Sequence, residues 1–541
     1  MATVALVGPE IEENLSLRYL AAALSRAGEQ VEIVPFNGPE AFRSTLQRLV
    51  GVGGPPAVVA ISLAFQWRAS ECLAVAVALR SAGYRGHITA GGHFGTFAAA
   101  ELLRDFPELD SICRHEAEET LVELAHAVRD GRPLAGIHGL ALRESGGVVL
   151  TPLRAPPDLA CLPWPTRFGE PVQCLGHRIA ALVGSRGCYA RCAFCCIAAW
   201  HEQTLPGKRF RLRPVDDVAD EMAFLVHGRC IDTFIFHDDN FFLPSPTRSL
   251  ERIEALADAL DARGVGRIAT VVKARPPDVT REVFGAMQRR LGLARVYLGI
   301  ETDAKQGLQT LGRQVAQEQN HAAMGILAEL GVYACFNLLI FDPDTTLDSL
   351  TANLAFMREH GDSPCNFGRV ELYAGTPLLE RMQREGRCTG DYLGWDYSIA
   401  EPRVQRIFEL ATRCFFPRNF AAGALANRLM STRFDVEMCR HFRPDVFQSA
   451  WLERAKALSR ALSSDSVRGL ERIIDFSGAD AVRSAQDDFV ARLSVKLRAT
   501  EAAVGAGAAE LEHEVQRAAD SEREDTHPFV PATLMTAEEF R

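Results

Sequence analysis

Four cysteines stand within nine residues of one another at positions 188–196 of this 541-residue chain. Three of them, Cys188, Cys192 and Cys195, follow the pattern C-x3-C-x2-C directly after a predicted strand. Three thiolates on one short loop can converge on a single soft metal centre, because zinc and iron–sulfur clusters both take thiolate ligands. Cys196 is adjacent to Cys195, so its side chain is directed elsewhere and it is a poor fourth ligand of the same centre.

Two kinds of metal centre fit this spacing. A structural zinc site requires a fourth ligand, which His201 could supply. Three ligands also suit a cubane iron–sulfur cluster with one iron left open to a substrate or cofactor. In that second interpretation the open iron would be the chemically active position.

The residues around the cysteines favour the second interpretation. The stretch GSRGCYARCAFC (184–195) resembles the signature of the radical S-adenosylmethionine (SAM) superfamily, with Phe194 at its aromatic position. In that family the cysteines hold a [4Fe–4S] cluster whose fourth iron chelates the amino and carboxylate groups of SAM. Reduction of the cluster then cleaves SAM to a 5′-deoxyadenosyl radical. The resemblance implies that Cys188, Cys192 and Cys195 are the cluster ligands.

The same resemblance assigns SAM contacts to polar residues at the ends of later strands. FHDDNFF (236–242) falls where the family contacts the SAM amino group, which implies this role for Asp238, Asp239 and Asn240. Carboxylates at this point would pair with an ammonium group. The alternative is that these residues cap the helix that follows.

Three further charged residues end later strands of the same unit. The resemblance implies that Lys273 and Arg275 meet the SAM carboxylate and that Glu301 accepts from the ribose hydroxyls. Each could instead form an ordinary ion pair at the barrel mouth. Relatives often carry G-x-P-G-E-T after the fifth strand, whereas this chain reads FDPDTT (341–346), with Thr345 and Thr346 as a helix start. This departure affects the adenine side of the site.

Residues 1–150 are predicted to fold around a parallel sheet. Five short apolar runs alternate with amphipathic helical patterns, which indicates a doubly wound, Rossmann-like α/β domain. Ligands of such sheets bind at the carboxyl ends of the strands, where the strand order reverses. The predicted strands are 3–8, 30–36, 57–65, 86–92 and 110–116.

A proline-rich linker at 151–175 leads to a second β/α series at 176–380. Its six apolar runs predict a partial or full β/α barrel, with the working residues at the C-terminal ends of the strands. Residues 381–541 are predicted to be mainly helical, to close the substrate cavity, and to end in a loosely held helix and an acidic tail. The six predicted strands are 179–185, 232–242, 267–275, 295–302, 333–343 and 368–376.

Composition limits the class of partner. The net charge is −10 and the basic residues are scattered, which argues against a nucleic-acid partner. The chain has no run of eighteen apolar residues and no basic leader, so no membrane partner and a cytoplasmic location are expected. Its fourteen cysteines are then expected to be thiols or metal ligands. The dense basic stretch 207–213 is either a solvated strand face or the partner of a carboxylate or phosphate.

The first domain carries a second resemblance. SLAFQW (62–67), AGGHFGT (90–96) and RHEAEETL (114–121) follow the third, fourth and fifth predicted strands, and LPWP (162–165) lies in the linker. This arrangement before a cysteine loop is similar to the cobalamin-binding radical SAM enzymes, over roughly residues 1–380. The resemblance implies cobalamin contacts at Gly8, Ser62, Phe65, Gln66, Trp67, Gly91, Gly92, His93, Thr96 and Glu116.

The lower face of the cobalamin is expected to lack a histidine ligand. The D-x-H-x-x-G motif, whose histidine ligates cobalt in many B12 domains, does not occur in this sequence. The resemblance therefore implies base-off cobalamin whose lower face is covered by residues 65–68. His93 could replace the missing ligand, but binding of an amide or a phosphate is the favoured role for this loop histidine.

The resemblance implies a B12-dependent radical SAM methyltransferase. In this chemistry a methyl group passes from methylcobalamin to an unactivated carbon or a phosphinate phosphorus after the deoxyadenosyl radical has removed a hydrogen. Ring formation or rearrangement without net methyl transfer, polar methyl transfer to an sp2 carbon, and a non-enzymatic B12 or cluster sensor are the alternatives. The expected partners are a small-molecule or peptide substrate and an external reductant. Tyr373, Trp395 and Tyr397 are substrate-contact candidates by position, although core packing is their favoured role.

Overall fold

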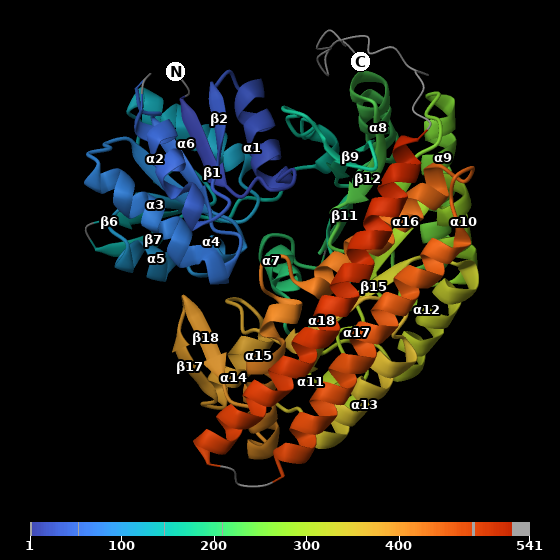
Figure 1. Cartoon of the computed structure of the whole chain (residues 1–541). Helices are drawn as coiled ribbons and strands as arrows, with labels where there is room; N and C mark the ends of the chain where they lie inside the picture. Colours follow the sequence, from blue (N-terminus) through green and yellow to red (C-terminus); the bar gives the residue numbers. More distant parts are fainter. Residues whose placement is uncertain (1–2, 52–53, 145, 208, 479–481, 522–541) are drawn as a thin grey trace.

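The computed structural model describes residues 3–51, 54–144, 146–207, 209–478 and 482–521. Two α/β units stand next to each other, and long helices run along the second of them (Figure 1). In Figure 1 the first unit is blue to teal, the second is green to yellow, and the long helices are orange and red. No helix in these ranges is long and apolar enough to cross a membrane.

A seven-stranded sheet forms the centre of the first unit. Its strands are β1 (Val4–Gly8), β2 (Val31–Pro35), β3 (Val58–Ser62), β4 (His87–Gly91), β5 (Ser111–Cys113), β6 (Leu140–Glu144) and β7 (Gly147–Leu150). They lie in the order β2-β1-β3-β4-β5-β6-β7. The predicted parallel set β1 to β5 is confirmed, and β6 and β7 extend it as an antiparallel hairpin.

Helices cover both faces of this sheet, which explains why its inner strand β1 is apolar throughout. All five residues of β1 are buried, as expected for a parallel strand packed on both sides. Leu24 and Leu124 belong to the hydrophobic cluster on one face, and Leu73 and Leu102 belong to the cluster on the other. The helices are α1 (Leu15–Arg26), α2 (Phe42–Val50), α3 (Ala69–Ser81), α4 (His93–Phe97), α5 (Ala99–Asp105) and α6 (Glu118–Asp130).

The second unit is a partial β/α barrel, as predicted. Its strands are β8 (Val172–Cys174), β9 (His177–Leu182), β12 (Ile231–Phe236), β13 (Ala269–Ala274), β14 (Leu293–Leu298), β15 (Ala334–Phe341) and β16 (Cys365–Arg369). They lie in the order β16-β15-β14-β13-β12-β9-β8, all parallel except the edge strand β8. The connecting helices are α8 (Val215–Arg229), α9 (Pro246–Ala262), α10 (Arg281–Leu291), α11 (Lys305–Thr310), α12 (Gln317–Leu330) and α13 (Leu347–Glu359).

The position of the sixth predicted strand, 368–376, was wrong. The strand that pairs with β15 is Cys365–Arg369, and the following residues form a loop. The carbonyl of Leu372 and the N–H of Ala374 form hydrogen bonds with the side chain of Gln66 in the first unit, and Leu372 also forms an isolated antiparallel bridge with Trp395. The alternating apolar pattern of this segment therefore belongs to a loop between the units.

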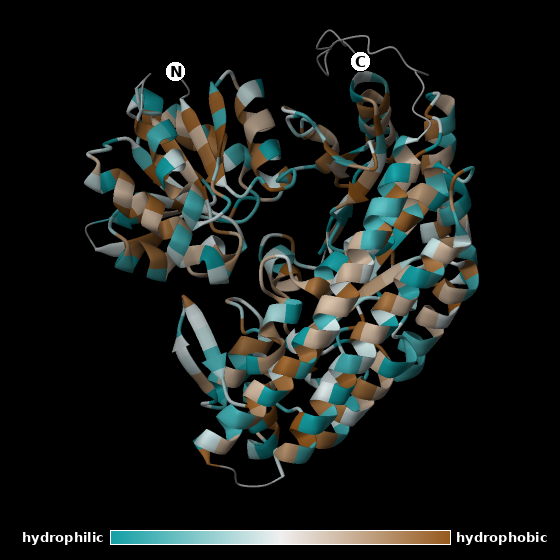
Figure 2. Ribbon diagram, viewed as in Figure 1, coloured by the Kyte–Doolittle hydropathy of each residue, from teal (hydrophilic) through white to brown (hydrophobic). Residues whose placement is uncertain are grey.

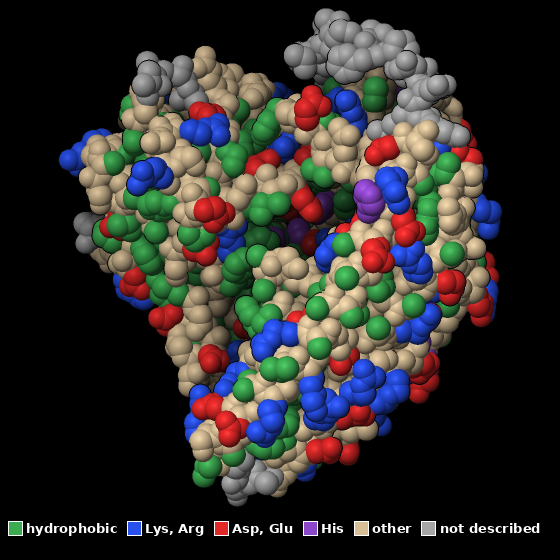
Figure 3. Space-filling view, viewed as in Figure 1, with side chains coloured by type: hydrophobic (Ala, Val, Ile, Leu, Met, Phe, Trp, Pro, Cys, Tyr) green, Lys and Arg blue, Asp and Glu red, His purple; other side chains and the backbone are tan. Residues whose placement is uncertain are grey.

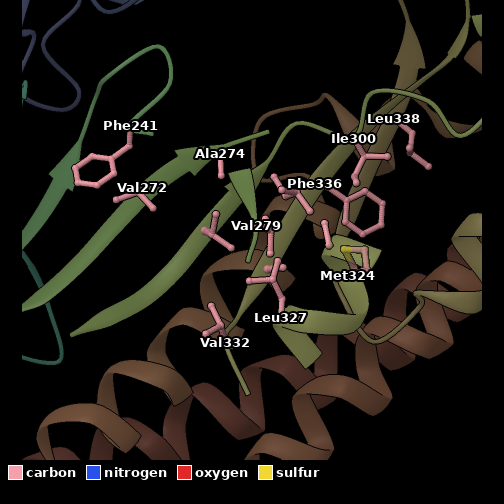
Figure 4. Packing of buried hydrophobic residues seen from close by; sticks show 14 of the residues in the cluster. Phe241, Val272, Ala274, Val279, Ile300, Met324, Leu327, Val332, Phe336 and Leu338 are labelled. Carbon is pink, nitrogen blue, oxygen red and sulfur yellow. The ribbon is translucent and has the colours of Figure 1, made fainter. Parts of the chain in front are cut away.

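The largest hydrophobic core fills the space between the second sheet and its helices. Val272 and Ala274 of β13 and Phe336 of β15 share this cluster with Met324 and Leu327 of α12 (Figure 4). Burying one such side chain contributes about 1.5–3 kcal/mol. This core therefore holds the strands whose carboxyl ends face the first unit.

The C-terminal region covers the other face of the second sheet. Val271 of β13 and Cys335 of β15 share a cluster with Phe434, Met438 and Trp451 of the long helices. In its described residues the region consists of helices, the loops between them and one hairpin that the sequence did not predict. Brown and teal alternate along the long helices in Figure 2. Its elements are α14 (Pro377–Arg384), β17 (Cys388–Asp391), β18 (Gly394–Tyr397), α15 (Pro402–Asn419), α16 (Leu425–Phe442), α17 (Ser449–Phe476) and α18 (Arg483–Asp520).

The prediction of a loosely held last helix was wrong. In α18 the buried residues recur every three to seven positions, a helical spacing that its alanine-rich composition obscured. The fully buried Arg418 of α15 donates to Asp465 of α17 at 2.9 Å and to Glu501 of α18 at 2.9 Å. This network fixes three helices against one another. The acidic tail predicted beyond residue 521 lies outside the described residues.

Candidate active site

A cavity of about 1020 Å³ lies between the two units. Ser62 and Gly91, which end β3 and β4, line it from the first unit, and Lys273 of β13 lines it from the second. Figure 3 shows the recess between the units, with acidic and histidine side chains inside it. Ligand pockets range from about 300 to 1,000 Å³, so this volume suits a large cofactor together with a substrate.

The cysteine loop forms part of the wall of this cavity. Phe194, Cys195 and Cys196 line it. The loop is held by backbone hydrogen bonds of Ala193, which donates to Leu311 at 2.8 Å and accepts from Leu378 at 2.8 Å. The elements on either side of the loop are β10 (Ser185–Gly187), its antiparallel partner β11 (Phe210–Leu212) and α7 (Cys196–Thr204).

The three predicted ligands fit a cluster better than a single zinc ion. Cys188, Cys192 and Cys195 are free thiols, and their sulfur atoms do not all lie within 4.8 Å of one another. Ligands of tetrahedral zinc, each at about 2.3 Å, are closer together than that. A cubane cluster binds each thiolate to a different iron and so needs a wider spacing. The sulfur of Cys192 also accepts a hydrogen bond from Arg313 at 3.1 Å, a contact that stabilises a thiolate.

The three predicted SAM residues after β12 point in different directions. Asp239 lines the cavity, whereas Asp238 and Asn240 are buried behind it. Asp238 accepts hydrogen bonds from the hydroxyl of Ser185 and from the backbone N–H of Gly184. Burial raises the pKa of Asp238, against the effect of these hydrogen bonds. The alternative role as helix caps was wrong, since Ser245 caps α9.

The other charged SAM candidates also differ in whether they face the cavity. Lys273 faces the cavity, whereas Arg275 and Glu301 lie behind the cysteine loop with Arg313. A guanidinium N–H of Arg275 donates to the carbonyl of Arg313. Burial raises the pKa of Glu301, and the charges of the two arginines oppose this shift. Glu301 has φ of +63°, so its strand-end backbone is strained.

Seven of the ten predicted cobalamin residues line the cavity. The other three are nearby: Gly8 packs against Ser62, Trp67 is 68% exposed, and the hydroxyl of Thr96 accepts from the N–H of His115 at 2.8 Å. Those that line the cavity are Ser62, Phe65, Gln66, Gly91, Gly92, His93 and Glu116.

The Gly91-Gly92 turn requires glycine at its second position. Gly92 has φ of +101°, and a Cβ there would lie 2.9 Å from the backbone nitrogen of Ala64. We expect Gly92→Ala to destabilise the protein by at least about 2 kcal/mol in urea unfolding and to weaken cobalamin binding. Gly131→Ala is the matched control, because its φ is also positive, +65°, and its Cβ would meet no atom within 4 Å. Equal losses in the two variants would contradict this prediction.

Gln66 connects the units across the cavity. Its side-chain amide donates to the carbonyl of Leu372 at 3.2 Å and accepts from the N–H of Ala374 at 3.0 Å. Both hydrogen-bonding groups of this predicted cobalamin contact are therefore taken up by the protein. Phe65, beside it, is 54% exposed and offers an apolar surface to the cavity.

A charged network also joins the units. Glu116, after β5, accepts from Arg186 of β10 at 2.6 Å and from Arg211 of β11. Arg186 also pairs with Glu118 at 2.7 Å. The basic stretch that contains Arg211 thus meets carboxylates, one of its two predicted roles. His201, the candidate fourth zinc ligand, lies 3.7 Å from Glu116 through Nδ1 and not with the cysteines.

Aromatic and imidazole rings pack together in the cavity wall where the two units meet. Trp200 of α7 packs against His93 and His115 of the first unit, with ring centroids 4.3 and 4.8 Å apart. Burial lowers the pKa of His93, and it lowers the pKa values of His115 and His201 to about 4. All three imidazoles are therefore neutral at pH 7 and suited to bind amides or phosphates by hydrogen bonds.

Comparison with known families agrees with this geometry. Residues 2–125 match the B12 binding domain, and residues 182–356 match the radical SAM superfamily. The protein is a B12-binding radical SAM enzyme. The first matched region contains β1 to β5 of the first sheet, and the second contains β12 to β15 of the second sheet.

Curated relatives of this radical SAM enzyme have several activities. It is 26% identical over 395 residues to the anaerobic magnesium-protoporphyrin IX monomethyl ester cyclase of Rubrivivax gelatinosus, covering 71% of this chain and 66% of the relative. It is 28% identical over 297 residues to an uncharacterized methyltransferase of Pyrococcus horikoshii, covering 54% and 62%. The chain thus spans less than two thirds of the length of either relative.

Two solved structures share the fold over most of this chain. The cobalamin-dependent SAM radical enzyme OxsB, with aqua-cobalamin and SAM bound, matches with a TM-score of 0.66 and 18% identity over 96% of this chain and 84% of that one. The radical SAM methyltransferase TsrM from Kitasatospora setae, with cobalamin and a [4Fe–4S] cluster bound, matches at 0.57 and 19% over 71% and 75%. At these identities the likeness establishes the fold.

Several residues of this radical SAM enzyme's cavity were missed by sequence reasoning. Trp200 and Arg186 gave no local signal, because their partners are distant in sequence. Arg313 lies in a turn after α11 without a motif. Among the aromatic candidates, Tyr373 lines the cavity, whereas the buried hydroxyl of Tyr397 donates to a backbone carbonyl at 2.8 Å and Trp395 packs against the core.

Proposed function

We propose that this enzyme transfers a methyl group to an unactivated carbon, or to a phosphorus, of a small natural-product molecule or a peptide. One observation carries the proposal: the strand ends of the B12-binding sheet and the cysteine loop of the radical SAM sheet line the same cavity. A methyl donor on one side and a hydrogen-abstracting group on the other would share this space with the substrate. The Pyrococcus relative, named as a methyltransferase, supports the assignment.

The residues present suit the cofactors that the two domains imply. Cys188, Cys192 and Cys195 would hold a [4Fe–4S] cluster, and Asp239 and Lys273 would meet the ammonium and carboxylate groups of SAM. When bound, the cluster with SAM supplies radical hydrogen abstraction, and cobalamin supplies the methyl group. Cobalamin would contact Ser62, Phe65, Gly91, Gly92 and His93.

The remaining wall positions the substrate and excludes water. Trp200 is 5% exposed, and it closes the cavity where the units meet. Tyr373 and His93 face the interior, where a phenol and a neutral imidazole can hydrogen-bond a substrate. An external reductant would be required to start the reaction.

Ring formation is the second candidate, because the Rubrivivax relative is named as a cyclase. The same cavity and cofactors would serve that reaction without net methyl transfer. The two candidates differ in the fate of SAM, since methyl transfer consumes SAM as a methyl donor and also as the radical source.

The test is anaerobic reconstitution of the full chain with iron, sulfide and hydroxocobalamin, followed by reduction in the presence of SAM. We expect about four irons and one cobalt per chain, with release of both 5′-deoxyadenosine and S-adenosylhomocysteine. The absence of bound cobalamin would overturn the proposal. Deoxyadenosine without S-adenosylhomocysteine would favour ring chemistry, and S-adenosylhomocysteine without deoxyadenosine would favour polar methyl transfer to an sp2 carbon.

A further inference from the structure

A cluster of histidines and carboxylates lies away from the cavity, on the helices of the second unit. His321 is on α12, Glu359 ends α13 and His360 follows it. One ligand atom of each of these three residues lies within 4.8 Å of the other two. None of them lines the cavity between the units.

The imidazole of His321 is held from behind by a buried carboxylate. Its Nε2 lies 3.1 Å from Asp303, and its Nδ1 lies 3.3 Å from Glu359. Asp303 is 4% exposed and also accepts from the amide of Asn320 at 2.9 Å, which fixes its orientation. A carboxylate that accepts from one imidazole nitrogen is the arrangement that orients a metal-binding histidine. Nδ1, which faces Glu359, is therefore the nitrogen that remains available to bind a metal ion.

His360 supplies a second nitrogen to the same point. Its Nε2 is buried without a hydrogen-bond partner among the described residues and lies 3.6 Å from Glu359. The ring packs on Phe356, with centroids 4.4 Å apart. Burial lowers the pKa of His360, so the imidazole is neutral and its lone pair is available at pH 7. A buried nitrogen without a partner is costly, and a metal ion would remove this cost.

The charge around His321 also suits a cation. Although burial opposes the shift, the carboxylates of Asp303 and Glu359 raise the pKa of His321. The same negative charge that favours a proton on this imidazole would favour a divalent ion in its place.

We propose that Nδ1 of His321, Nε2 of His360 and the carboxylate of Glu359 bind one Zn²⁺ ion, with water as the fourth ligand. Two imidazoles and a carboxylate are a zinc-binding set. The side chain of Glu359 is 58% exposed and free to adjust to the ion. Asp303 positions His321 and lies two residues after Glu301, so the ion ties α12 and α13 to the loop behind the cysteines.

The experiment uses full-length protein in which Cys188, Cys192 and Cys195 already hold the iron–sulfur cluster, so that these three thiols cannot bind the added metal. After chelator treatment, Zn²⁺ is titrated and bound zinc is counted by elemental analysis. We expect one zinc per chain, with affinity at least about 100-fold weaker in His321→Ala or His360→Ala and about 10–100-fold weaker in Asp303→Asn. His227→Ala is the matched control, because this exposed imidazole on α8 lies outside the cluster and should not change the affinity.

Cobalt substitution gives a second measurement that identifies the ligands. Co²⁺ bound to nitrogen and oxygen ligands gives weak visible bands without intense thiolate charge transfer, and these bands should vanish in the double variant His321→Ala/His360→Ala. Circular dichroism and cluster content show whether each variant is folded. Absence of zinc from the wild-type protein, or undiminished zinc in the folded double variant, would overturn the proposal. Neither measurement depends on SAM turnover, so failure here is distinct from failure of the proposed function.

Discussion

Alanine at Cys188, Cys192 or Cys195 is expected to remove most of the iron from the reconstituted protein and to lower SAM cleavage below about 1% of the wild-type rate. Each thiolate would hold a different iron of the cluster, so loss of one leaves an iron without a protein ligand. Iron and sulfide analysis after anaerobic reconstitution, followed by quantification of 5′-deoxyadenosine, measures both effects.

Cys196→Ala is the matched control for these variants. Cys196 begins α7, lines the same cavity and differs from Cys195 by one position, yet it is expected not to bind iron. The variant should keep its iron and its SAM cleavage. Loss of iron in Cys196→Ala equal to that in Cys195→Ala, or retention of iron in Cys195→Ala, would contradict the assignment of the ligands.

Glu116→Ala is expected to lower the free energy of unfolding by about 3 kcal/mol, the lower end of the range for breaking a buried ion pair. The substitution leaves Arg211 without its carboxylate, while Arg186 keeps Glu118 at 2.7 Å. The side chains of Glu116, Arg186 and Arg211 are 9%, 17% and 14% exposed, so water replaces the lost contact poorly. Urea unfolding of the full chain measures the change.

The surface pair of Glu123 and Arg154 provides the comparison. These groups are 2.6 Å apart, but Glu123 is 49% exposed, and exposed pairs contribute about 0–1 kcal/mol. Glu123→Ala should therefore change stability little. Because Glu116 joins the two units, its variant should also become more sensitive to proteolysis in the linker 151–175, a change that Glu123→Ala should lack. Equal stability of the two variants would contradict the role of Glu116 between the units.

The direction of each polar side chain near the cavity could not be predicted from its position in the sequence. FHDDNFF identified the right loop, but only Asp239 of its three polar residues faces the cavity. Successive side chains of an extended segment point to opposite sides, and the sequence alone did not indicate which side would be open. Lys273 and Arg275 are two positions apart, so regular alternation would place both on one side of the sheet. Instead β13 ends at Ala274, and Arg275 beyond it is turned toward Arg313 while Lys273 faces the cavity.

The cysteine spacing, the Gly91-Gly92 turn and the alternation of apolar runs with helical patterns were determined by the sequence itself. These features are local, because they depend on residues within a few positions of one another. The tertiary structure decided which elements meet. Glu116 and Arg211 are 95 residues apart, and His321 and Glu359 are 38 apart. No local pattern encodes such a contact, since it forms only when packing of the two hydrophobic sheets and their helices brings distant strand and helix ends together.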